Sequence, residues 1–164
     1  MLRLITFVAA LSVSMQAALV ASPKATKIAA EIDPAWSTVS FRIEDSRAFV
    51  GVAPVYLTVS ELQSEDGKLV GTYTIEVPLM TSKNDHGKIV LPLNITVAEL
   101  GGKGGTLRGK AISKKYDATV NLIVCEVLPK KDKAIHLAIT TDDRTIKFKS
   151  RYTMIEAAET REDV

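Results

Sequence analysis

The sequence predicts a single all-β domain of antiparallel strands, arranged as a β-sandwich or an up-and-down barrel. Apolar residues recur at every second position over several segments, which is the period of a strand with one buried face. These segments are rich in Val, Ile, Thr and Tyr, which suit a pleated surface. Turn sequences separate them at fairly even spacing, which is typical of sandwiches and barrels and indicates roughly eight to ten strands.

Four segments show the alternation most clearly: 36–43, 69–77, 88–97 and 145–154. In each, apolar side chains on one face oppose polar or charged side chains on the other, as in antiparallel strands with one solvated face. The connections between strands fall at 44–47, 64–68, 82–88, 101–105, 113–117, 129–133 and 141–144. Asp66-Gly67 is typical of a tight hairpin turn, and the Gly-rich segment 101–105 is expected to be a flexible loop. No helix is predicted.

Segment 116–128 is apolar on both faces, with Leu122 and Val124 on one and Ile123 and Cys125 on the other. Such a strand either lies at the centre of a layered core or lines a cavity on one side, and both alternatives stay open. We place the first face inside. The residues expected in the interior are therefore Phe41, Tyr73, Ile75, Leu91, Leu93, Leu122, Val124, Phe148 and Tyr152.

The first 21 residues resemble a secretory signal peptide. Arg3 precedes an uncharged apolar run that ends in small residues before Pro23. At roughly 18 residues, the run is marginal for spanning a bilayer. We therefore expect a signal peptide at 1–21, an all-β domain at 22–155 and a flexible tail at 156–164. The mature protein is expected to be periplasmic or secreted, with no stable membrane span after cleavage.

Charge and cysteine content narrow the classes of partner. Cleavage removes one of 21 basic residues and none of the 19 acidic ones, so the net charge falls from +2 to +1. That balance offers no electrostatic case for nucleic acid or for an anionic membrane surface. Cys125 is the only cysteine and cannot form an internal disulfide. No nucleic-acid partner is predicted.

No motif that carries chemistry is complete. Residues 104–110 match a phosphate-binding loop up to its lysine, but Ala111 stands where that motif needs a hydroxyl. His86 and His136 are far apart in sequence, and spacing supplies no further metal ligands. No nucleophile elbow occurs, and Cys125 lies in a strongly apolar segment. We therefore predict neither an enzyme nor a cofactor or metal site.

The segment IDPAWSTVSFRI (32–43) resembles the start of the YceI-like family, secreted bacterial proteins associated with polyisoprenoids or other long-chain lipids. The matching positions are Asp33, Pro34, Ala35, Ser37, Val39 and Phe41. The segments 66–77 and 145–152 are similar to later parts of the family pattern. The resemblance implies a lipocalin-like antiparallel barrel whose apolar interior holds an extended chain.

Two functions are compatible with the sequence. The first is an exported barrel that binds an elongated apolar ligand through Phe41, Tyr73, Leu122, Val124, Phe148 and Tyr152. Small residues on these strands (Gly71, Gly109, Ala118 and Ala138) are expected to leave room for a cavity open at one barrel end. The alternative is a filled sandwich that serves as a structural or protein-interaction module of the cell envelope.

Overall fold

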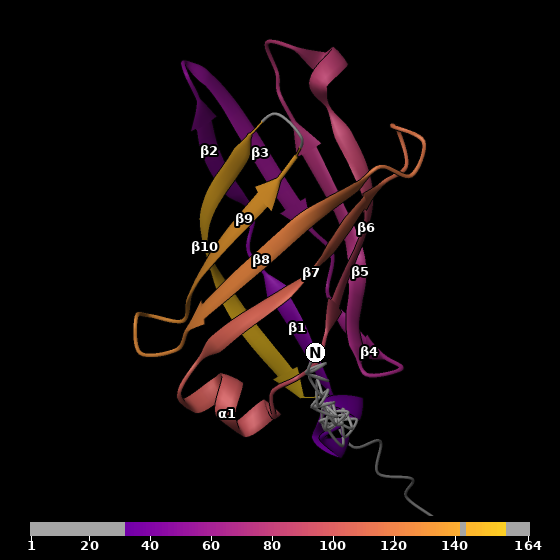
Figure 1. The fold of residues 1–164 in the computed structure, drawn as a ribbon. Helices are drawn as coiled ribbons and strands as arrows, with labels where there is room; N and C mark the ends of the chain where they lie inside the picture. Colours follow the sequence, from indigo (N-terminus) through magenta and orange to yellow (C-terminus); the bar gives the residue numbers. More distant parts are fainter. Residues whose placement is uncertain (1–31, 142–143, 157–164) are drawn as a thin grey trace, which may run out of the picture.

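One curled antiparallel sheet makes up the protein in the computed structural model, which describes residues 32–141 and 144–156 (Figure 1). Its ten strands confirm the predicted all-β fold, with the curl of a half-barrel. The strands are β1 (Val39–Ile43), β2 (Ser46–Val50), β3 (Ala53–Val59), β4 (Gln63–Glu65), β5 (Lys68–Glu76), β6 (Asp85–Pro92), β7 (Gly105–Ser113), β8 (Val120–Leu128), β9 (Ala134–Thr140) and β10 (Thr145–Glu156).

The strand order places the first and last described strands, β1 and β10, side by side. It runs β1-β10-β9-β8-β7-β6-β5-β3-β2, with β4 paired to β5. The curl also brings β1 to the far side of the sheet, where Phe41 exchanges two backbone hydrogen bonds with Leu62, at 2.8 and 2.9 Å. The sheet therefore encloses one interior and does not split into two facing sheets.

Short helices occupy positions where strand or loop was expected. The strand predicted over 88–97 ends at Pro92, and α1 (Val97–Gly102) begins at the last residue of that segment and extends into the first two residues of the loop expected at 101–105. Thr96 caps this helix, because its side chain accepts a hydrogen bond from the backbone N–H of Glu99 at 3.2 Å. The other two are single 3-10 turns, η1 (Pro34–Ser37) and η2 (Thr81–Lys83).

The IDPAW segment (32–36) is hydrogen-bonded to the segment that leads into α1. One carboxylate oxygen of Asp33 accepts from the N–H of Ala35 at 3.0 Å and caps η1, while the other accepts from the N–H of Val97 at 2.9 Å. Trp36 is buried, and its indole N–H donates to the carbonyl of Ile95 at 2.9 Å. The segment therefore joins η1 to the start of α1, and its local role is structural.

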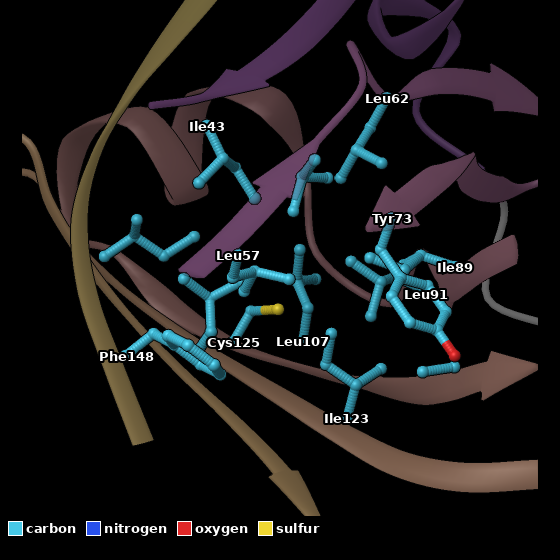
Figure 2. Packing of buried hydrophobic residues seen from close by; sticks show 14 of the residues in the cluster. Ile43, Leu57, Leu62, Tyr73, Ile89, Leu91, Leu107, Ile123, Cys125 and Phe148 are labelled. Atoms are coloured by element: carbon cyan, nitrogen blue, oxygen red, sulfur yellow. The ribbon is translucent and has the colours of Figure 1, made fainter. Parts of the chain in front are cut away.

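The interior is lined by alternate residues of the strands, as expected for most of them. Seven of the nine predicted interior residues are buried: Phe41, Tyr73, Ile75, Leu91, Leu93, Phe148 and Tyr152. Figure 2 shows Tyr73, Leu91 and Phe148 among the apolar side chains gathered within the curl. Alternation therefore predicts the inner face correctly wherever the opposite face is polar.

The prediction for β8 was wrong by one residue. Leu122 is 49% exposed and Val124 lies on the same outer face, whereas Ile123, Cys125 and Val127 point inward and are at most 1% exposed. Because both faces of this strand are apolar, hydrophobicity alone does not distinguish the two registers, and a slip of one residue exchanges them.

Two predicted segments fall wholly or mostly beyond the described residues. The signal peptide at 1–21 lies outside them, as does the tail at 156–164 apart from Glu156, which ends β10. The described part of the predicted domain 22–155 forms one continuous sheet.

Candidate functional site

The interior predicted to bind an apolar ligand is occupied by the protein's own side chains. Phe41, Tyr73, Phe148 and Tyr152 each expose 3% of their surface or less. The rings of Phe41 and Tyr152 stack with their centroids 4.9 Å apart and their planes 9° from parallel. Packing of this kind fills the space between the strands, so these side chains form core contacts with one another.

The small residues expected to enlarge the interior do not do so. A Cβ atom on Gly71 would lie 2.5 Å from a methyl carbon of Leu62, and one on Gly109 would lie 2.0 Å from the carbonyl oxygen of Val90. Neighbouring atoms already occupy both positions, which lets the backbones approach closely. Ala118 lies in the turn before β8, and Ala138 is on the outer face opposite Val124.

One polar cluster is built into the inner surface at the start of β6. The hydroxyl of Tyr73 donates to the Asp85 carboxylate at 2.7 Å, and the buried Ser113 hydroxyl donates to its other oxygen at 2.5 Å. Burial, and then the hydrogen bond to Asp85, raises the pKa of Tyr73 above its ordinary value. A phenol held neutral and fully engaged in this way stabilises β5, β6 and β7 against one another.

Cysteine and histidine side chains offer no assembled reactive group among the described residues. Cys125 is buried in the core, and burial raises the pKa of its thiol to about 12. His136 lies 3.2 Å from a Glu126 oxygen on the outer surface, and His86 is exposed at the start of β6. Residues 32–141 and 144–156 contain no group of three side chains arranged to hold a metal ion.

A small cavity of about 210 Å³ lies near one end of the sheet, beside α1. It is lined by Gly101, Pro129, Lys133, Tyr152 and Met154. Tyr152 is the one predicted ligand-binding residue that reaches it. The volume is below the range of about 300–1,000 Å³ that is usual for small-molecule sites.

The exposed side of β8 is the more distinctive surface. Val120 and Leu122 are 54% and 49% exposed, and Val124 continues the same apolar line. Strand pairing sets basic residues beside this line: Arg108 lies opposite Val124 and Lys110 opposite Leu122 on β7. On the other side, Ala138 of β9 pairs with Val124 of β8 and with Lys147 of β10, so Lys147 lies two strands from Val124 in the same row.

We call this surface the basic–apolar face and define it by six residues: Arg108, Lys110, Val120, Leu122, Val124 and Lys147. It has an apolar middle with cations on both sides. Exposed apolar patches rimmed by polar residues are typical of interaction sites. Leu122 and Val124, predicted to bind a ligand from inside, therefore belong to an outer surface together.

The sequence predicts the apolar part of this surface but not its basic part. The doubly apolar pattern of 116–128 marks an unusual strand, but the basic residues beside it come from strands that are distant in the chain. Only the register of β7, β8, β9 and β10 brings them into rows.

Comparison with protein-family models, curated proteins and solved structures finds no match to this chain. The resemblance to the YceI-like family therefore stays a prediction based on segment 32–43 and the similar strands. Within the described residues, no helix combines the length and the apolar character needed to cross a membrane.

Proposed function

We propose that the protein is a non-enzymatic binding module of the cell envelope that acts through its outer surface. The observation that carries this proposal is the exposed apolar line Val120, Leu122 and Val124, which has cations on both sides. A solvated strand normally has polar residues on its outer face. Large apolar side chains that contribute little to the core point instead to a binding partner.

Export is part of the proposal and rests on the sequence of residues 1–21. N-terminal sequencing of protein purified from its own host should find a new terminus near Ser22 or Leu19. Retention of Met1 on membrane-bound protein would contradict export.

The basic–apolar face is tested by one substitution on β8 and a control substitution outside the face. Leu122→Ser should leave the fold intact and reduce association of the protein with the envelope fraction of the cell. Lys103→Ser, at the end of α1 and away from this face, is the control for an exposed substitution. Unchanged association of the Leu122→Ser variant would contradict the proposed function.

An elongated apolar ligand is the second candidate, supported by the cavity beside Tyr152 and Met154. With about 210 Å³, this cavity can take the end of a chain, whereas a longer insertion requires core side chains to move. Native mass spectrometry of protein from its own host tests this hypothesis. A co-purifying hydrophobic molecule that is lost in Met154→Trp would support it, and a bare protein mass in repeated preparations would oppose it.

A further inference from the structure

The outer surface of the sheet separates charge in a way that the nearly balanced net charge conceals. Outward positions of β6–β10 carry cations on three strands: Lys88 on β6, Arg108 and Lys110 on β7, and Lys147, Lys149 and Arg151 on β10. Among the outward positions of these five strands in the described chain, Glu126 is the only carboxylate. This side of the protein is therefore basic.

Part of this charge is already paired, and part is free to meet a partner. Arg151 pairs with Asp132 at 3.1 Å, whereas Lys149 makes no ion pair within the described residues and borders a shallow depression that also contains Glu44 and Asp45. No ion pair within the described residues involves Arg108, Lys110 or Lys147. These three cations belong to the basic–apolar face and adjoin its apolar line on both sides.

The shape of the face favours a broad and flat partner. The sheet curls around its core, so the outer surface of β7–β10 is convex, with β8 and β9 as its two middle strands (Figure 1). The three strand spacings between β7 and β10 amount to about 14 Å. A flat surface therefore meets Leu122 and Val124 first, while the longer Lys and Arg side chains reach it from either side.

From this arrangement we propose that the basic–apolar face docks on the surface of an anionic lipid bilayer. Leu122, Val120 and Val124 would enter the headgroup region, and Arg108, Lys110 and Lys147 would pair with lipid phosphates. The inference rests on the proposed function, because it names the partner of the same face. It concerns binding at the surface of a bilayer.

Charge argues against a second copy of the chain as the partner. A symmetric dimer through this face would set the cations of one protomer against those of the other. Like charges brought together in an interface destabilise it, and few carboxylates lie on this face to offset them. An anionic bilayer supplies negative charge over its whole area.

The experiment is co-sedimentation with vesicles, using protein in the N-terminal form that the cell produces. One set of vesicles contains phosphatidylglycerol and phosphatidylcholine, and the other contains phosphatidylcholine alone. Wild-type protein should bind the first set at least tenfold more tightly than the second, and added salt should weaken that binding. Equal binding to both sets, or binding to neither, overturns the inference.

Matched charge reversals test whether this face is responsible. Lys110→Glu combined with Lys147→Glu should weaken binding to the anionic vesicles at least tenfold. Lys103→Glu combined with Lys131→Glu changes the net charge equally at exposed positions outside the face and should retain most of the binding. Equal losses in the two double variants would show a general charge effect and overturn the assignment.

Leu122→Ser separates the lipid inference from the proposed function. If it abolishes envelope association in cells while wild-type protein ignores anionic vesicles, the face binds a protein partner and only the lipid inference fails. If it converts a dimer to a monomer in light scattering, the partner is a second copy and the lipid inference fails as well. If envelope association and vesicle binding are both unchanged, both proposals fail.

Discussion

Adjacent residues of β8 should respond very differently to truncation, because one faces the core and the other faces solvent. Ile123 is 0% exposed and Leu122 is 49% exposed, although both are large and apolar. Truncating a buried Ile to Ala removes its transfer free energy and leaves a cavity, which together cost about 2–5 kcal/mol. A half-exposed Leu has about half of a full burial free energy of roughly 1.5–3 kcal/mol to lose.

We therefore expect Ile123→Ala to lower the free energy of unfolding by about 2–5 kcal/mol and Leu122→Ala by about 0.8–1.5 kcal/mol. Urea denaturation followed by tryptophan fluorescence measures both, because the one Trp is buried in the core. With a urea dependence of about 1–3 kcal/mol/M, the first variant should shift the midpoint by about 1–2 M. Equal shifts, or a larger shift for Leu122→Ala, would refute the register and with it the outer position of Leu122.

Three further predictions concern the core thiol, the close approach of β6 and β7 at Gly109, and the opening turn. Cys125 should react with a thiol reagent only after denaturation. Burial raises the pKa of its thiol to about 12, so the stability that the neutral thiol contributes is complete below its unfolded pKa of about 8.5 and is lost as pH rises toward 12. This part of the pH dependence of stability should be absent in Cys125→Ala. Gly109→Ala places a Cβ 2.0 Å from a carbonyl oxygen and should lower the melting temperature by several degrees, whereas Gly102→Ala meets nothing within 4 Å and should leave it nearly unchanged. Asp33→Ala removes two backbone hydrogen bonds and should cost about 1–2 kcal/mol, with faster amide exchange at Val97; unchanged exchange there would contradict the role of the turn.

The inner face of the sheet could be predicted from sequence wherever polarity differs between the two sides of a strand. Phe41, Tyr73 and Phe148 alternate with polar neighbours, and each lies in the core as expected. Leu122 and Val124 do not, because their neighbours Ile123 and Cys125 are equally apolar. The choice between the two faces of β8 depends on packing with β7 and β9, which a single strand does not encode.

The strand predicted over 88–97 contains a helix-start motif that the alternation of apolar residues concealed. Thr96 and Glu99 stand three residues apart, the spacing of a capping box, and this box begins α1. Apolar residues at 93, 95 and 97 continued the strand period across it. Helix capping and strand periodicity therefore competed over the same residues, and capping matches the observed helix.

Small residues were the least informative part of the pattern. Gly71 and Gly109 suggested spare volume, yet each admits a neighbouring atom at a distance that no Cβ tolerates. Sequence distinguishes a small side chain from a large one but does not show what fills the space beside it. The cations of the basic–apolar face could not be grouped from sequence either. Lys110 on β7 and Lys147 on β10 lie on the same face only because β8 and β9 pair between them.

The pairing of β1 with β10 has a consequence for how the chain folds. Val39 lies opposite Glu156, so the first described strand finds its partner only when nearly the whole chain is available. Sheets that depend on such distant contacts fold slowly, because the entropy of closing a long loop opposes the pairing. Until β10 arrives, β1 and β9 each present an unpaired edge that other chains can extend. A chain that ends before residue 145, and so lacks β10, should therefore aggregate rather than form a smaller soluble sheet.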